Sequence, residues 1–421
     1  MLEKYNNKNF LNNPYFLSAL QICNSFLNIA IISLITRYYS FSTLGLIAFS
    51  QSIAGIFTTF ISECFDQIII LKITKEKYNL SNIVSTTISA RFILIIPIII
   101  FSYIFIILKT QFSLLGLIMA CELLKSIVPA TLIDRYKETY ILVLISILER
   151  IIIFISIIYL LNKSDYILNH LFIIISISGL IFIILSLYAF KIKITKIYIC
   201  RNFQLIYEEI ISSIKGIPNI FSKVSFIYYA KLLMGLNGLY SDLGKFSIIH
   251  KIVNVCVMPT SYYFRLCYGK LINITKGMIK KIKFDSKYNA EKNIFKILNK
   301  GLLISILNFC ILILIINNEF LINKFPEILA IDNLKLPCLI LFIYVSMTKF
   351  EQIFELIFIG VFGRKKLLGF YLPGSIISII LLSTIGLKFN LSVLISCFFI
   401  GHANNSFRLI SKIYKTIRTN Y

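Results

Sequence analysis

Residues 83–108 read IVSTTISARFILIIPIIIFSYIFIIL, and Arg91 is the only charged residue among them. A helix needs about 20 mostly apolar residues to cross the hydrocarbon core of a bilayer. Segments of this kind recur along the chain, and twelve candidates lie near residues 15–35, 43–71, 83–108, 112–133, 139–161, 167–190, 217–240, 243–268, 301–316, 336–362, 368–387 and 390–410. The sequence therefore predicts an all-α polytopic membrane protein with about 12 transmembrane helices.

The composition agrees with a membrane location. Of the 421 residues, 58% are hydrophobic and 15% are charged, and the mean hydropathy is +0.84. A soluble domain carries about 25% charged residues, and a disordered chain lacks apolar residues to bury. Both of these classes are excluded. The nine cysteines are scattered without any CxxC pair, so the sequence predicts neither a disulfide framework nor a zinc site.

The net charge of +24 comes from 43 Lys and Arg against 19 Asp and Glu. If both termini are cytoplasmic, the segments on that side hold about four times as many Lys and Arg as the opposite loops, as the positive-inside rule requires. The charge therefore indicates orientation, with both termini in the cytoplasm. It needs no nucleic-acid partner to explain it.

The chain divides into two predicted six-helix halves, residues 1–200 and 201–421, with the basic segment 191–215 between their helices. A short repeat supports this division. Ser42-Thr43-Leu44-Gly45 and Ser241-Asp242-Leu243-Gly244 each join the first and second helices of a half. Repeated halves in the same orientation are typical of transporters.

Motifs of soluble enzymes are missing from the sequence. The stretch from Gly238 to Gly244-Lys245 has the wrong glycine spacing for a phosphate loop, and no GxSxG, HExxH or Cys/His cluster occurs. We therefore expect a protein that is not an enzyme, with no catalytic residue, no cofactor and no metal site.

Ionisable residues inside the spans are the main functional signal, because a charge at mid-bilayer costs at least about 2.5–3.5 kcal/mol and usually faces a cavity or a partner. The bases with this placement that we predict to bind substrate are Lys223, Lys231, Lys251, Arg265, Arg91 and Arg150. A stacked series of cations suits an anionic group such as a pyrophosphate. For Lys223 and Arg265 the alternative is that each side chain extends to the interface.

Two pairs of acids are candidates for proton coupling. Glu63 with Asp66, and Glu351 with Glu355, place like charges one helical turn apart. The alternative is that nearby lysines such as Lys349 neutralise them. Glu122 and Lys125 have the same spacing with opposite charges, so we expect them to pair.

The first predicted helix carries a polar stripe that includes Gln21, Asn24 and Asn28. Their spacing puts them on one face, which we expect to turn toward the bundle interior. These side chains either line a cavity or form hydrogen bonds between helices.

Three stretches of the chain resemble one known family. They are Asn13, Leu17, Gln21 and Asn24 with Arg37, Leu44-Gly45 and Phe49; Leu243-Gly244-Lys245-Phe246-Ser247 with Lys251-Ile252 and Pro259; and Phe362-Gly363-Arg364-Lys365-Lys366. They are similar to the O-antigen flippase (Wzx) family of polysaccharide flippases, in the multidrug/oligosaccharidyl-lipid/polysaccharide (MOP) exporter superfamily. The resemblance implies the MATE-like fold of two six-helix bundles.

The resemblance also implies a function in lipopolysaccharide or other polysaccharide biosynthesis. Such flippases move an undecaprenyl-pyrophosphate-linked oligosaccharide, an O-antigen or capsule repeat unit, across the bacterial inner membrane by alternating access. The implied partners are this polyprenyl-linked substrate, membrane lipids, a polysaccharide polymerase and a chain-length regulator. The competing interpretations are a membrane glycan polymerase or ligase, and a MATE-type drug/cation antiporter.

Overall fold

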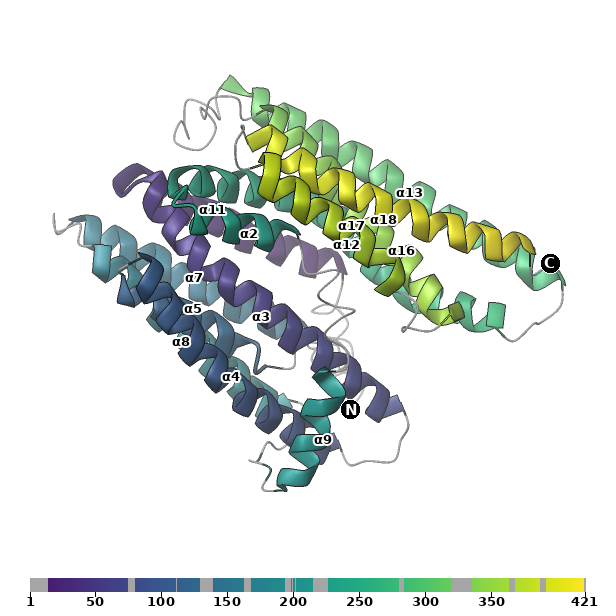
Figure 1. Cartoon of the computed structure of the whole chain (residues 1–421), viewed down its shortest axis with the longest axis horizontal. Coiled ribbons are helices and arrows are strands. Elements are labelled where there is room, and N and C mark those ends of the chain that lie inside the picture. The colour runs from purple at the N-terminus through teal and green to yellow at the C-terminus, as the bar shows by residue number, and fades with distance from the viewer. Residues whose placement is uncertain are drawn as a thin grey trace. The chain divides into compact units, whose positions relative to one another are not determined.

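The structure is a computed structural model, and it describes residues 14–74, 80–110, 112–128, 139–162, 168–193, 198, 200, 202–214, 226–279, 284–319, 335–362, 368–386 and 391–419. These residues form thirteen α-helices and one π-helical segment (Figure 1). The described part of the chain is therefore helical, as the sequence predicts.

The chain forms two compact units, Met1–Ser247 and Ile248–Tyr421. The first contains α2 (Pro14–Tyr38), α3 (Phe41–Thr74), α4 (Leu80–Thr110), α5 (Ser113–Lys125), α7 (Thr139–Asn162), α8 (Leu168–Lys193), α9 (Phe203–Ile214), α11 (Phe226–Leu236) and the start of α12 (Tyr240–Ile279). The second contains the rest of α12, then α13 (Phe284–Asn317), α16 (Lys335–Phe362), α17 (Leu368–Leu381), the π-helical η2 (Leu382–Gly386) and α18 (Leu391–Thr419). The boundary between these compact units lies inside α12. The division into six-helix halves, 1–200 and 201–421, concerns the transporter repeat and stays a prediction.

Each of the twelve predicted spans overlaps a helix, and six helices are long and apolar enough to cross a membrane. Helix α5 ends at Lys125, inside the span predicted for 112–133. Helix α11 (Phe226–Leu236) ends shortly before the predicted limit at residue 240, and the first part of the span 217–240 lies outside the described residues. One helix was not predicted at all: α9 lies within the basic segment 191–215.

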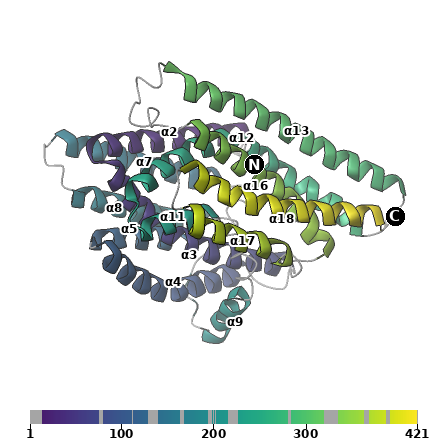
Figure 2. The same ribbon diagram turned by 45° about the horizontal axis from the view of Figure 1, so that its top comes forward.

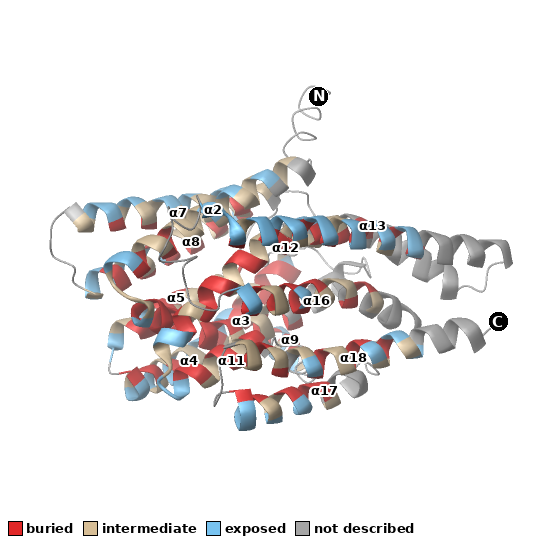
Figure 3. Ribbon diagram, turned by 90° about the horizontal axis from the view of Figure 1, so that it is seen from above, coloured by how far each residue is buried: buried red, intermediate tan, exposed pale blue. Residues whose placement is uncertain are grey.

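Large apolar side chains are exposed along the outer helices. On α13 they include Phe295, Leu302, Leu303 and Leu314, and Figure 3 shows this helix with long exposed stretches. Lipid tails are the natural contact for such faces, because water penalises contiguous apolar surface. The chain is therefore a multi-pass membrane protein. The cytoplasmic location of its termini remains a prediction.

Helix α5 lies at the centre of the first unit, where it packs against α3, α4 and α8. Small residues permit these close approaches. A side-chain carbon added at Gly116 would lie 2.2 Å from the ring of Tyr103 on α4. The arrangement buries most of α5, including Leu115, Met119 and Leu123.

The two copies of the sequence repeat meet in the structure. Gly45, in the first turns of α3, approaches the backbone of Tyr240, and Gly244, at the same place in α12, approaches the backbone of Phe41. A β-carbon added at these glycines would lie 1.8 Å and 2.1 Å from the two carbonyl oxygens. Glycine Cα–H groups can make weak hydrogen bonds to carbonyls at such crossings. The contact is reciprocal, so the repeat marks one crossing of two helix starts.

Candidate functional site

Lys125, the last residue of α5, joins two acidic residues. Its Nζ lies 3.0 Å from Oε1 of Glu122 and 2.8 Å from Oε1 of Glu149 on α7. The predicted pair of Glu122 and Lys125 is confirmed. Glu149, whose side chain is only 4% exposed, was missed because its partner is 24 residues away in sequence. One ammonium group thus bridges carboxylates from two helices.

Aromatic and basic residues complete the surroundings of Lys125. Its Nζ lies 5.3 Å from the ring centre of Phe182 on α8, within cation–π range. Arg150, next to Glu149, is close enough to act electrostatically on Lys125. Arg150 is half-buried and forms no ion pair with any residue that the structure describes. The two bases and two acids balance, but only Lys125 is paired.

Helix α11 carries two further polar side chains, of which Tyr228 lies near Glu122. Tyr228 packs against Gly55 of α3, and the charge of Glu122 acts on its hydroxyl. Lys231 lies three residues later, on the same face of α11, and its side chain is 8% exposed. Its Nζ lies 6.0 Å from the ring centre of Phe246 on α12. No described carboxylate pairs with Lys231.

We refer to Glu122, Lys125, Glu149, Arg150 and Tyr228 as the charged cluster. It draws on α5, α7 and α11, and all of its members belong to the first unit. Its two bases balance its two acids, whereas Lys231, one turn beyond Tyr228 on α11, has no described counter-ion. A buried cation without a partner is costly. An added anion would therefore stabilise Lys231.

Arg91 has a structural role that the sequence did not predict. Its side chain is 0% exposed, and its Nη1 donates to the carbonyls of Ser126, at 2.8 Å, and Val128, at 3.3 Å. The last carbonyls of a helix lack partners within the helix and carry a partial negative charge. Arg91 of α4 thus caps the end of α5. Its predicted contact with substrate stays a prediction.

The polar stripe on α2 takes part in packing between helices. The amide of Asn24 donates to Oγ of Ser146 on α7, at 3.0 Å. Gln21 and Asn28 are half-buried, one turn to either side. The interhelical hydrogen bond, the second of the two predicted alternatives, is therefore present at Asn24.

In the second unit, Glu351 of α16 pairs with His402 of α18. Nε2 of His402 lies 2.5 Å from Oε2 of Glu351, and both side chains are buried. The ring of Tyr344 packs edge-on against His402, with centroids 5.2 Å apart. A described ion-pair partner of Glu351 is thus a histidine 51 residues later in the chain.

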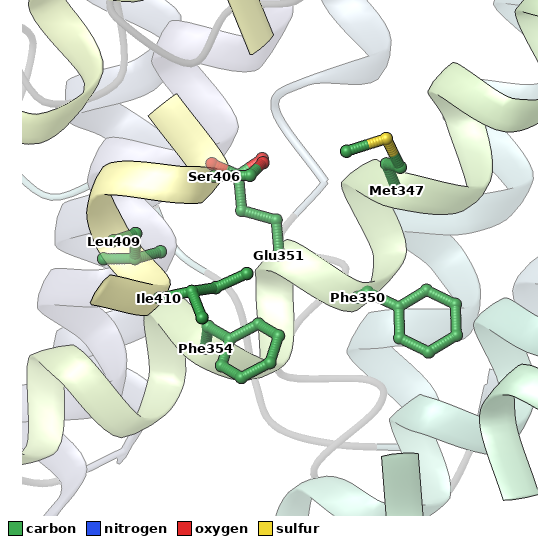
Figure 4. Close-up of a pocket in the computed structure, with 7 residues that line it drawn as sticks. All are labelled: Met347, Phe350, Glu351, Phe354, Ser406, Leu409 and Ile410. Atoms are coloured by element: carbon green, nitrogen blue, oxygen red, sulfur yellow. The ribbon is translucent and has the colours of Figure 1, made fainter. Parts of the chain in front are cut away.

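A small pocket of about 90 Å³ opens beside this pair. Figure 4 shows Glu351 extending from α16 toward Ser406 of α18, among apolar side chains that include Met347, Phe350 and Phe354. Oε1 of Glu351 and Oγ of Ser406 are buried there without a hydrogen-bond partner in the described residues. The carboxylate oxygen of Glu351 can therefore accept a proton, and both oxygens can hydrogen-bond to a water molecule.

Several predicted site residues cannot be assigned surroundings. Lys223 lies outside the described residues, and so do the side chains of Arg265, Glu63, Asp66 and Glu355. Lys251 is half-buried on α12, in the second unit. The structure thus places Arg91, Arg150 and Lys231 in the first unit and Lys251 in the second. Among the described residues, no group of three or more His, Cys, Asp or Glu could hold a metal ion.

The sequence itself matches no family profile and no curated protein. Solved structures do match. The MATE multidrug transporter DinF-BH has a TM-score of 0.64 at 12% identity, covering 97% of this chain and 95% of that one. The MATE transporter VcmN of Vibrio cholerae has a TM-score of 0.60 at 11% identity, covering 98% of each chain. The lipid II flippase MurJ, in an inward closed conformation, has a TM-score of 0.58 at 17% identity, covering 96% of this chain and 90% of that one. The chain therefore has the fold of these membrane transporters.

Proposed function

We propose that the chain is a flippase that moves an undecaprenyl-pyrophosphate-linked oligosaccharide, an O-antigen or capsule repeat unit, across the bacterial inner membrane by alternating access. The observation that carries this proposal is Lys231, a buried lysine with no described carboxylate partner. Arg150, a second base of the first unit, lies beside the acids that Lys125 bridges. A pyrophosphate supplies the missing negative charge, and lysine binds phosphate as a point charge.

The state of the acids argues for an anionic substrate. A drug or cation antiporter of the same fold would need a carboxylate available to its cationic substrate. In the charged cluster both carboxylates, Glu122 and Glu149, already bind Lys125. The shared fold with MATE transporters and MurJ is compatible with either substrate class, so the engaged carboxylates of the cluster and the charge of Lys231 decide our choice.

Lys231 offers a direct test with a matched control. We expect Lys231→Ala to abolish complementation of a deletion strain, measured as surface polysaccharide, and Lys231→Arg to retain part of it because the charge remains. Lys245 of α12 is the control, since it is half-buried and its Nζ lies 3.9 Å from Asp242. Lys245→Ala should complement at the wild-type level. Full activity of Lys231→Ala at normal protein level would remove it from the substrate path.

The substrate class needs a separate experiment. Deletion of the gene should leave lipid-linked repeat units in the cytoplasmic leaflet, measured by their accessibility to a periplasmic glycan ligase. Efflux of a cationic dye should be unchanged. The reverse result, with normal transfer of lipid-linked units and reduced dye efflux, would show that the protein is a cation antiporter.

We propose further that Glu351 and His402 form the proton-coupling site. Together they carry no net charge when they share one proton, which is the least costly state inside a membrane. A second proton would make the pair cationic and weaken the link between α16 and α18. Glu351→Gln should therefore leave transport insensitive to an imposed proton gradient. Gradient-dependent transport by that variant would exclude Glu351 as the coupling residue.

A further inference from the structure

Helix α9 has three distinct faces. Successive residues of an α-helix are about 100° apart, and the exposure of each side chain follows this rotation. The three faces are a packing face of Ile206, Glu209 and Ser213, an exposed apolar stripe of Phe203, Tyr207 and Ile214, and an exposed, mostly polar face of Gln204, Glu208 and Ser212 that also includes Leu205. Phe203 is 78% exposed and Tyr207 is 64% exposed. A helix in water would not keep such residues together on an uncovered face.

The packing face is held firmly against the rest of the first unit. Helix α9 lies against α4 and α3, and Figures 1 and 2 show it beside the N-terminal part of α4. Thr87 of α4 donates to Oε1 of the buried Glu209 at 3.0 Å. The direction of the apolar stripe is therefore fixed by hydrogen bonding as well as by packing.

The residues just before α9 bind the same part of α4. The backbone N–H of Tyr198 donates to Oγ of Ser85 at 3.1 Å, and that of Cys200 donates to Oγ of Ser89 at 3.0 Å. These two serines lie one turn apart on α4, so the bonds follow the helix axis. Together with Glu209 they hold α9 at a defined level on α4.

At this level the exposed side chains of α4 change from polar to apolar. The exposed apolar face of α4 starts at Phe92 and Ile93, which is about 10 Å along the axis from Ser85 at 1.5 Å per residue. The start of α4, with Asn82 exposed, precedes the contacts with α9. Helix α9 is thus held close to the boundary between the headgroups and the acyl chains.

We propose that α9 is an interfacial anchor whose apolar stripe, Phe203, Tyr207 and Ile214, inserts into the headgroup region of an anionic lipid leaflet. Helices of this kind lie in the plane of the interface with their apolar face partly buried. The sequence adjoining α9 is basic, with Lys191, Lys193, Lys196, Arg201 and Lys215. Basic residues near the surface are attracted to anionic headgroups. This charge identifies an anionic membrane surface, and not a second protein, as the partner.

The absence of tryptophan from the sequence makes a clean test possible. Phe203→Trp and Tyr207→Trp each introduce a single fluorophore on the apolar stripe, and Gln204→Trp and Glu208→Trp place one on the polar face as matched controls. The full chain is reconstituted in phosphatidylglycerol vesicles with or without bromine on the acyl chains near the headgroup. Wild-type protein supplies the background.

Brominated lipid should remove more than half of the fluorescence of Phe203→Trp and Tyr207→Trp, while aqueous acrylamide has little effect on them. Gln204→Trp and Glu208→Trp should behave in the opposite way. Equal quenching of all four by acrylamide, or protection of the stripe from both quenchers in a dimer, would overturn the proposal. Quenching of the stripe should weaken in phosphatidylcholine vesicles, and equal quenching there would refute the preference for anionic lipid. Because no transport is measured, the outcome is independent of the proposed flippase activity.

Discussion

The reciprocal glycine crossing predicts a sharp effect of a single methyl group. In Gly45→Ala, the new carbon would lie 1.8 Å from the carbonyl oxygen of Tyr240, and real β-carbons essentially never come closer than 3.0 Å. The helix starts must therefore separate by more than about 1 Å, because the obstacle is backbone and cannot rotate away. Overpacking of this kind costs about 1–3 kcal/mol. The alanine regains at most about 1 kcal/mol of helix propensity.

The assay is the thermal unfolding midpoint in detergent, compared with Gly386→Ala. At Gly386 the nearest atom to an added β-carbon is the flexible Cδ2 of Leu382, at 3.3 Å. We expect Gly45→Ala and Gly244→Ala each to unfold several degrees below this control. The double variant should lose less than the sum, because one separation accommodates both methyl groups.

Two results would refute this reasoning. If Gly45→Ala unfolds at the same temperature as the control, the two helix starts have room for the added methyl group, contrary to the distance of 1.8 Å between its carbon and the carbonyl oxygen of Tyr240. Strictly additive losses in the double variant would mean that the two glycines do not share one contact.

Three further changes test individual side chains. Lys125→Met should destabilise the protein by about 3–5 kcal/mol because it leaves the buried Glu149 unpaired. The control, Lys245→Met, should cost at most about 1 kcal/mol. Denaturant unfolding measures both losses of stability. Arg91→Met should cost about 2–4 kcal/mol because the carbonyls at the end of α5 lose a charged donor, and thermal melts without that loss would contradict the capping role. His402→Gln should reduce gradient-driven transport as Glu351→Gln does, and normal coupling in that variant would show that Glu351 acts without its partner.

Local spacing predicted the contacts that a single helix makes. Glu122 and Lys125 lie three residues apart, so any helix brings them together, and they pair at 3.0 Å. The same rule could not find Glu149 or His402, because their partners lie on other helices. His402 carried one signal that could have been used, a histidine inside an apolar span, but no partner could be assigned to it from spacing.

The amphipathic helix α9 was hidden by its setting. Its sequence is short and lies between basic residues, so the segment 191–215 was interpreted only as a cytoplasmic connection. The exposure of Phe203 and the burial of Glu209 become visible only when α4 is packed beside them. Arg91 shows the opposite case: its place within a span suggested a cavity, and packing turned it toward the end of α5.

By itself, the sequence determined that this chain is a bundle of membrane helices and which residues share a helix face, because the bilayer imposes span length and the helix imposes a period of 3.6 residues. Only the tertiary structure decided which charges remain available. Lys125 pairs with two acids and Arg91 donates to backbone carbonyls, whereas Lys231 pairs with no described carboxylate. The physical reason is that charge pairing between helices depends on how the helices cross. Small residues such as Gly45 and Gly244 permit a close crossing between segments that are about 200 residues apart in sequence.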